Sequence, residues 1–258
     1  MKFARFEYQG NVLLGVVKGE VITVLDGSLF EDYEETKTHY PLSDIRLLPP
    51  VIPTKIVCVG LNYRKHIQEI GSDVPERPSV FLKPLTSLIG HGDAIIYPRN
   101  AERVDYEGEL AVVIKDKIKD IPENQALQYV LGCSCFNDVT ERALVMKDHR
   151  FLTIAKSFDT FGALGPYVVT DLDPNKLTVK TYLNGNVMQH DSTDNCIFSV
   201  QHLLSYVSQC MTLFPGDVIS TGTPKGVGSM NPGDVVEVEI EGIGRLRNTV
   251  KAALTAPS

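Results

Sequence analysis

The sequence predicts a mainly β fold with a few helices, in the α+β class. Short apolar runs separated by turn-forming residues dominate the 258-residue chain, and only a few stretches repeat apolar residues at helical spacing. The composition, 43% hydrophobic and 22% charged residues, is typical of a globular protein, and a chain of this length can bury about 75% of its unfolded surface. We therefore expect a folded protein in which strands predominate.

The first 50 residues are expected to form a small β lobe. Turn formers separate three short apolar runs, which predict strands at residues 3–6, 12–17 and 21–25. A polar, acidic stretch follows at residues 31–40. Residues 48–53 then contain three prolines, and each proline fixes its own φ and keeps the preceding residue extended. We place a domain boundary in this stiff segment, between a lobe of residues 1–50 and a main domain of residues 51–258.

The main domain is expected to contain both strands and short helices. Strands are predicted at residues 55–60, 109–114, 235–240 and 245–247. Helices are predicted at residues 63–70, 125–130 and 199–211. The first helix should end at Gly71, which suits the left-handed C-terminal position, and Ser199 is the expected N-cap of the last. The two final strands should form a hairpin whose glutamates alternate with inward apolar residues.

Composition and charge exclude several classes of partner. Twenty-five Lys and Arg against 32 Asp and Glu leave a net charge of -7, which argues against a nucleic-acid partner because phosphate binding needs a basic face. No apolar run approaches the length of a membrane-spanning helix, and the N-terminal residues lack the apolar core of a secretion signal. The five cysteines fit no CxxC spacing, so we expect reduced, buried thiols in a cytoplasmic protein.

Two glutamates at the start of a predicted strand are the first candidate site residues. Glu107 and Glu109 are two apart, so they share a strand face with Cα atoms roughly 6.5–7 Å apart. Carboxylates at that distance repel, so that either both point into water or a cation holds them together. Gly108 between them removes a side chain from the opposite face and allows another backbone to come close. The alternative interpretation is a solvated strand end.

A third carboxylate makes a solvated strand end a less favoured interpretation of the two glutamates. Residues 131–138 are a nearly uncharged run that ends in Asp138, and a carboxylate closing a buried strand is costly unless it is paired or coordinated. Three carboxylates on two strands, Glu107, Glu109 and Asp138, would form a hard-oxygen site for Mg²⁺ or Mn²⁺. In isolation, Asp138 is equally compatible with an N-cap of the segment 139–146.

A histidine and a glutamate on the first predicted helix are candidates for proton transfer. His66 and Glu69 are three residues apart and therefore neighbours on one helix face. A carboxylate beside an imidazole fixes its tautomer and raises its basicity, as a general base requires. A surface ion pair is the alternative, because this spacing is common by chance.

The loop at residues 220–228 is rich in hydrogen-bond donors. Its glycines and two threonine hydroxyls offer N–H and O–H groups suited to cradling a carboxylate. It lacks the GxxxxGK[ST] spacing of a phosphate loop. The alternative interpretation is a tight connection between strands.

Taken together, these features resemble the fumarylacetoacetate hydrolase family. The residues that carry the resemblance keep the family's order and cover roughly residues 53–250. They are Gly60 to Tyr63 with His66 and Glu69, Phe81 to Pro84, Glu107 to Leu110, Asp138 with Thr140 and Arg142, Ala155 to Thr160, and Thr221 to Gly228. No single piece would suffice, but the set is highly specific.

The resemblance implies a mixed β-roll fold, a homodimer, and one Mg²⁺ or Mn²⁺ ion per subunit. The matching residues are Glu107, Glu109 and Asp138 as metal ligands, His66 and Glu69 as the base, Lys156 as a cation near the substrate, and Lys83, Arg142 and Thr223 as pocket residues. Two departures matter. Ala143-Leu144-Val145 follows Arg142 where the family usually has D-[LV]-Q, and Asn62-Tyr63 stands where the member that cleaves fumarylacetoacetate has a fourth carboxylate near the metal. The chain more closely resembles the smaller, acylpyruvase-like branch.

The expected function is that of a divalent-metal-dependent hydrolase acting on a small 2-oxo acid. It would cleave a C–C bond of an acylpyruvate or related β-diketo acid through a metal-stabilised enolate, with His66 taking a proton from the attacking water. The same enolate would serve an oxaloacetate decarboxylase or a keto–enol isomerase of 2-hydroxy-dienoic diacids. A non-catalytic module that binds a metal or a carboxylate is the alternative from another class.

Overall fold

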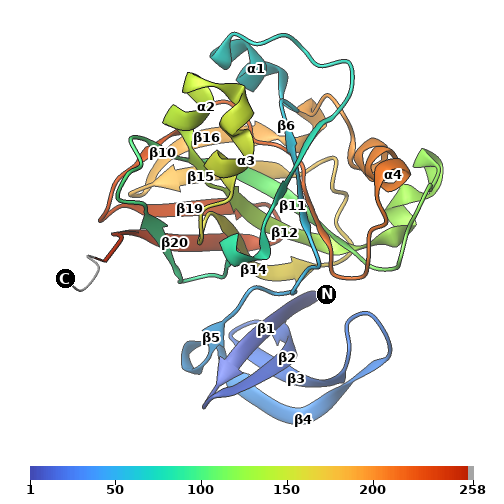
Figure 1. Ribbon diagram of the computed structural model, residues 1–258. Coiled ribbons are helices and arrows are strands. Elements are labelled where there is room, and N and C mark those ends of the chain that lie inside the picture. Colours follow the sequence, from blue (N-terminus) through green and yellow to red (C-terminus); the bar gives the residue numbers. More distant parts are fainter. Residues whose placement is uncertain (255–258) are drawn as a thin grey trace.

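The structure, a computed structural model, describes residues 1–254 and consists of three β-sheets with a few short helices (Figure 1). The predicted mainly β, α+β fold class is confirmed. The last four residues of the predicted main domain, 255–258, lie outside the described residues. The two-domain division at residue 50 stays a prediction, and the sheets show how closely the two parts are joined.

Residues 1–50 form the lobe drawn in blue in Figure 1. Its strands are β1 (Lys2–Tyr8), β2 (Asn11–Lys18), β3 (Val21–Gly27), β4 (Tyr33–Pro41) and β5 (Arg46–Leu47). The first four pair antiparallel in chain order, and β1 also pairs with β14, with Lys2 opposite Val169 and Phe3 opposite Val168. The lobe therefore continues the largest sheet of the molecule.

The acidic stretch 31–40, for which the sequence predicted only polarity, forms most of β4. This strand lies at the edge of the large sheet and pairs with β3 alone. Most of its side chains are exposed, so polar residues are tolerated on both faces while the backbone pairs with β3. Apolar alternation was therefore not required to form this strand.

The large sheet continues through the main part of the chain in the order β14, β12, β11, β17, β6, β7, with β8 pairing β14. The strands are β6 (Ile56–Gly60), β7 (Ser79–Lys83), β8 (Leu88–Ile89), β11 (Gly108–Ile114), β12 (Val130–Asp138), β14 (Gly162–Val169) and β17 (Val218–Ser220). Every residue of β11 is buried: Leu110 and Val112 enter one apolar core, and Ala111 and Val113 enter a second core on the other face. A strand that is covered on both faces has a nearly continuous apolar sequence, as β11 has from Leu110 onward.

Two smaller sheets complete the fold. One contains β13 (Thr140–Glu141), β10 (Val104–Tyr106) and β18 (Gly228–Met230). The other contains, in order, β16 (Asn186–Ser192), β15 (Thr178–Leu183), β19 (Val235–Ile240), β20 (Gly244–Ala252) and β9 (Ala94–Tyr97). The predicted C-terminal hairpin is confirmed as β19 and β20, with Val236, Val238 and Ile240 buried between less buried glutamates.

Within residues 1–254, four α-helices and five 3₁₀ turns connect the strands. The helices are α1 (Arg64–Ile70), α2 (Arg142–Lys147), α3 (Leu152–Lys156) and α4 (Val200–Cys210), and the 3₁₀ turns are η1 (Leu42–Asp44), η2 (Leu85–Ser87), η3 (Glu123–Tyr129), η4 (His149–Phe151) and η5 (Thr193–Asn195). As predicted, α1 ends at Gly71 with φ 68°, and the Ser199 hydroxyl caps α4 by accepting from the His202 N–H at 3.3 Å. Helices α1, α2 and α3 gather at the end of the molecule opposite the blue lobe (Figure 1).

The prediction of a helix at residues 125–130 is corrected in type. The segment forms the 3₁₀ turn η3 and then enters β12 at Val130. Its hydrogen bonds join residues three apart, from the Gln125 N–H to the Pro122 carbonyl and from the Val130 N–H to the Leu127 carbonyl, which is the spacing of a 3₁₀ helix. As for the other expectations, all five cysteines are free and three of them are buried. Within residues 1–254, no helix combines the length and apolarity needed to cross a membrane.

Candidate active site

The three predicted carboxylates converge at the end of the large sheet near the short helices. Glu107 lies between β10 and β11, Glu109 is the second residue of β11, and Asp138 closes β12. Antiparallel pairing of β11 with β12 brings them together, and the Asp138 N–H donates to the Glu107 carbonyl at 2.9 Å. All three are buried, and one oxygen of each lies within 4.8 Å of the others.

Gly108 separates the two glutamates because another side chain occupies the space where its own would project. A Cβ built on Gly108 would lie 2.0 Å from Thr181 Oγ1 and 3.2 Å from Gln189 Oε1. The sequence predicted that another backbone would come close at this glycine, and the structure corrects this: the approaching groups are the side chains of Thr181 in β15 and Gln189 in β16. The face of β11 opposite the carboxylates is therefore closely packed.

Two buried lysines compensate part of the negative charge. Lys156, at the end of α3, donates from Nζ to Glu107 Oε2 and to Asp138 Oδ2, at 2.7 Å each. Lys83, the last residue of β7, donates to Asp138 Oδ1 at 2.6 Å and to the Val139 carbonyl at 3.0 Å. Each lysine is thus bound to a predicted metal ligand, in a position where an unpaired charge would be costly.

Arg142 continues the ion pairs on the other side of Glu107. Its Nη2 donates to Glu107 Oε1, and its Nε donates to Asp105 Oδ2 at 3.0 Å. Asp105 is fully buried, and it also accepts from Nε and Nη2 of Arg103 at 2.8 and 3.1 Å. Asp105 was not among the predicted site residues, although its place two residues before Glu107 puts it on the same strand face.

The charges around the acids shift their pKa values in opposite directions. Burial alone would raise the pKa of Glu107, but the Lys156 and Arg142 charges lower it to about 2. For Glu109, burial and then the charges of Asp138 and Glu107 raise the pKa well above its ordinary value. Negative charge therefore remains undercompensated at Glu109.

The donor set fits a hard divalent cation. Glu109 Oε2 accepts from the Ser220 hydroxyl at 2.5 Å and from the Gly222 N–H at 2.9 Å, whereas Oε1 has no hydrogen-bond partner within residues 1–254. Three buried carboxylates, one of them with a free oxygen and an excess of negative charge, provide the ligands that Mg²⁺ and Mn²⁺ prefer. Glu107, Glu109 and Asp138 could therefore hold such an ion.

The predicted His66–Glu69 pair forms on α1 and is anchored to the donor-rich loop. His66 Nδ1 lies 3.2 Å from Glu69 Oε2, and the Gly226 N–H donates to both Glu69 oxygens at 3.1 Å. His66 is buried, and the loop that holds Glu69 through Gly226 also binds Glu109 through the Gly222 N–H. Its Nε2 has no hydrogen-bond partner in the part of the chain that the structure describes. The imidazole is thus oriented from one side and free on the other.

The loop after β17 uses its donors on the protein's own carboxylates. The Gly222 N–H binds Glu109, and the Gly226 N–H binds Glu69. The Thr223 hydroxyl donates to the Gly108 carbonyl at 3.0 Å and accepts from Gln189 Nε2 at 2.8 Å. Its predicted contact with substrate stays a prediction, because both of these hydrogen bonds are internal.

The segment that departs from the family pattern, Ala143-Leu144-Val145, forms the first turns of α2. Glu141 caps this helix, since its Oε2 accepts from the Leu144 N–H at 2.6 Å. Its other oxygen accepts from the Glu102 and Arg103 N–H groups. The altered residues therefore leave the helix intact, and α2 still presents Arg142 to the acids.

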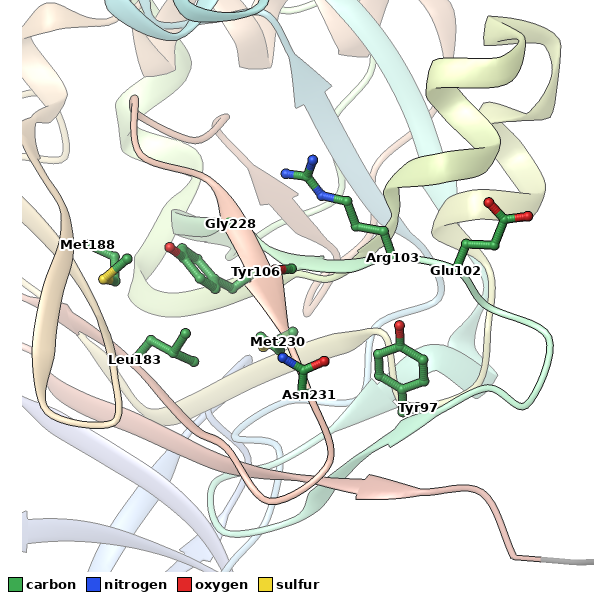
Figure 2. Close-up of a pocket in the computed structure, with 10 residues that line it drawn as sticks. Tyr97, Glu102, Arg103, Tyr106, Leu183, Met188, Gly228, Met230 and Asn231 are labelled. Carbon is green, nitrogen blue, oxygen red and sulfur yellow. The ribbon is translucent and has the colours of Figure 1, made fainter.

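A surface hollow of about 550 Å³ lies elsewhere and contains none of the predicted site residues. Figure 2 shows Tyr106, Met188 and Met230 around it, with Arg103 and Tyr97 at one side. Tyr106 separates this hollow from the site, because it directly precedes Glu107 and its hydroxyl donates to the Gly226 carbonyl at 3.0 Å. On the acid side, Lys156 bridges Glu107 and Asp138.

Comparison with known protein families decides the relationship that the geometry suggests. A family model described as fumarylacetoacetate (FAA) hydrolase C-terminal matches residues 55–251, most of the chain. The chain belongs to the fumarylacetoacetate hydrolase family. The mixed β-roll expected from the resemblance is thereby confirmed as the fold of this family member. A second model, described as Rv2993c-like, N-terminal, matches residues 1–50.

Relatives of this fumarylacetoacetate hydrolase family member include enzymes with isomerase and tautomerase names. An uncharacterized protein from Archaeoglobus fulgidus is 55% identical over 87% of this chain and 88% of its own. A mitochondrial oxaloacetate tautomerase from Rattus norvegicus is 40% identical over 81% of this chain and 71% of its own. A solved structure of 5-carboxymethyl-2-hydroxymuconate delta-isomerase from Mycobacterium smegmatis matches with a TM-score of 0.92 and 39% identity, covering 98% of this chain and 100% of that one.

Proposed function

We propose that the protein is a metal-dependent enzyme that moves a proton at the carbon beside the 2-oxo group of a small dicarboxylic acid, interconverting its keto and enol forms. The observation that carries the proposal is an imidazole oriented by Glu69, with a free Nε2, held by the same loop that binds Glu109 of the buried carboxylate cluster. The names of the rat tautomerase and the mycobacterial isomerase support this reaction type. The sequence alone had favoured C–C hydrolysis and held isomerisation as an alternative.

The charge of the site favours a dianionic substrate. Asp105, Glu107, Glu109 and Asp138 carry four negative charges when ionised, and Lys83, Lys156 and the mostly buried Arg142 carry three positive charges. A bound dication would leave one positive charge in excess, and the half-exposed Arg103, paired with Asp105, adds a second at the edge of the cluster. Charges removed from water need partners, and a 2-oxo dicarboxylate supplies two negative charges. Oxaloacetate is the simplest such substrate.

His66 would transfer the proton. Glu69 holds the imidazole through Nδ1, which leaves Nε2 to take a proton from carbon and return it to carbon or oxygen. Lys156 and Arg142 would offset negative charge that develops on the substrate. A divalent cation held by the three carboxylates would supply Lewis-acid polarisation of the 2-oxo group.

Disappearance of the enol form of oxaloacetate, followed by ultraviolet absorbance, tests this proposal. We expect catalysis by the wild type with Mn²⁺, little with EDTA, and a loss of about 10²–10⁴-fold in His66→Asn. The His66→Asn variant should still bind Mn²⁺ in calorimetry. His202→Asn is the matched control, because His202 also faces a glutamate, Glu123, at 3.1 Å but lies on the exposed side of α4.

Three outcomes would contradict the proposal in different ways. An unchanged rate in His66→Asn would remove the base assignment, and an equal loss in His202→Asn would show a non-specific effect. A wild type that binds Mn²⁺ without turning over oxaloacetate would favour either a metal-binding module or another substrate.

The homodimer implied by the resemblance stays a prediction.

Hydrolysis of an acylpyruvate is the second candidate. The matching family model is named for a hydrolase, and the free Nε2 of His66 would serve equally to take a proton from water. Assaying acetylpyruvate beside oxaloacetate with the same two histidine variants separates the two reactions. Cleavage of acetylpyruvate without tautomerisation of oxaloacetate would favour this candidate.

A further inference from the structure

Gln189, which none of the sequence motifs includes, lies behind the candidate metal ligands. It belongs to β16, the edge strand of the five-stranded sheet. Neighbouring residues of a strand point to opposite faces, and Met188 points to the surface hollow in Figure 2 while Gln189 is buried with 1% of its surface exposed. A buried amide of this size must find partners for both of its polar atoms.

All four hydrogen bonds that a glutamine side chain readily makes are formed. Oε1 accepts from the Gly108 N–H at 2.9 Å and from the Thr181 hydroxyl at 2.6 Å. Nε2 donates to the Thr223 hydroxyl at 2.8 Å and to the Pro224 carbonyl at 2.7 Å. One side chain thus joins β11, the β15–β16 hairpin and the loop after β17.

These contacts close a ring. The Thr223 hydroxyl, which accepts from Gln189, donates to the carbonyl of Gly108, whose N–H donates back to Gln189. Gly108 is the residue between Glu107 and Glu109, and the loop that contains Thr223 also binds Glu109 through the Gly222 N–H. The ring therefore fixes both the backbone between two carboxylates and the loop that holds one of them.

We propose that Gln189 is a positioning residue that clamps the Thr223 loop to the Glu107–Glu109 strand and so sets the geometry of the metal ligands. The inference rests on the metal site of the proposed function. Groups that orient metal ligands typically contribute 10–100-fold to metal affinity or activity, because ligands that are not held must be ordered when the ion binds. Gln189 acts through the backbone of Gly108 and through the loop, without touching the carboxylates.

Thr181 provides the control that separates positioning from general stability. Its hydroxyl belongs to the same buried network, bonded to Gln189 Oε1, and Thr181 is fully buried. Within residues 1–254 its side chain makes no hydrogen bond to the loop or to the backbone of β11. Thr181→Ala therefore removes a hydrogen bond from the network and leaves the Gly108–Gln189–Thr223 ring closed.

The test compares Gln189→Met with Thr181→Ala in two measurements. The first is Mn²⁺ affinity by calorimetry, and the second is the rate of tryptic cleavage after Lys225, an exposed residue of the same loop. We expect Gln189→Met to weaken Mn²⁺ binding by about 10–100-fold and to speed cleavage, since nothing then ties the loop to β11 through this side chain. Thr181→Ala should change neither the Mn²⁺ affinity nor the cleavage rate, even if it lowers Tm by as much as Gln189→Met does.

Each remaining outcome decides the matter. The proposal that Gln189 clamps the loop is overturned if Gln189→Met binds Mn²⁺ with the affinity of the wild type. It is also overturned if Thr181→Ala, at a matched Tm, loses as much Mn²⁺ affinity as Gln189→Met. If the wild type binds no Mn²⁺, the metal site of the proposed function fails, and cleavage after Lys225 alone judges the clamp. If Gln189→Met does not fold, Gln189→Glu replaces it, because glutamate keeps the acceptor for Gly108 and loses both donors to the loop. Unchanged cleavage in that variant overturns the proposal.

Discussion

The carboxylates and their partners were the most predictable residues of the site. Glu107, Glu109 and Asp138 were identified from strand periodicity and from the cost of burying a charge, and the structure places their oxygens together. Asp105 follows the same spacing but was missed as a partner of Arg142, because its role depends on a cation 37 residues away. Gln189 was not predictable from pattern, since its four partners come from three separate segments.

The opposite charge environments of the two glutamates lead to opposite effects of neutralising them. In the metal-free protein, Glu107→Gln should lower the free energy of unfolding by about 3 kcal/mol, because it leaves Lys156 and Arg142 short of a buried partner. Glu109→Gln should instead raise Tm, because burial and then the charges of Asp138 and Glu107 disfavour the charge on Glu109 and raise its pKa.

Thermal unfolding with and without Mn²⁺ checks this pair of variants. Both variants should lose most of the stabilisation that Mn²⁺ gives the wild type, because each lacks one ligand charge. If Glu109→Gln lowers Tm in the metal-free protein, the excess of negative charge at that residue is not the dominant effect.

At the scale of elements, periodicity predicted the strands and α-helices that have apolar faces. It did not predict the edge strand β4 or the 3₁₀ type of η3. Strand β11 and the β19–β20 hairpin followed their apolar patterns. Strand β4 lacks such a pattern because it is an exposed edge, and η3 looked helical because its residues favour helix, although its hydrogen bonds join residues three apart. Local patterns therefore failed where a neighbouring strand supplied the pairing and where a helical segment tightened into a 3₁₀ helix.

The close packing behind β11 predicts a strong effect of one methyl group. Gly108→Ala should lower the free energy of unfolding by about 1–3 kcal/mol or more, because its Cβ would lie 2.0 Å from Thr181 Oγ1. Gly60→Ala is the control, since its Cβ would meet nothing closer than 3.9 Å. Urea unfolding measures both. Equal midpoints for the two variants would show that the β15 side of the sheet yields easily.

At the scale of the whole molecule, the sheet order could not be derived from the sequence. The lobe of residues 1–50 has only two small apolar cores, and β1 pairs directly with β14 of the main part. Small units of this size rarely bury enough apolar surface to be stable alone. The proline-rich segment that predicted a boundary thus joins two parts of one continuous sheet.

We therefore expect the lobe to unfold together with the rest of the chain. Calorimetry should give a single transition, and Phe3→Ala should lower the free energy of unfolding by about 3–5 kcal/mol, because Phe3 is buried and pairs with Val168 across the junction. Val12→Ala is the control, since Val12 is 52% exposed within the same lobe. Two separate transitions in the wild type would mean that the lobe is an independent domain.

The loop after β17 holds two functional groups at once, Glu109 through Gly222 and Glu69 through Gly226. The candidate metal ligands and the proposed base therefore depend on one loop. If the proposed function holds, a change in this loop should alter metal affinity and proton transfer together.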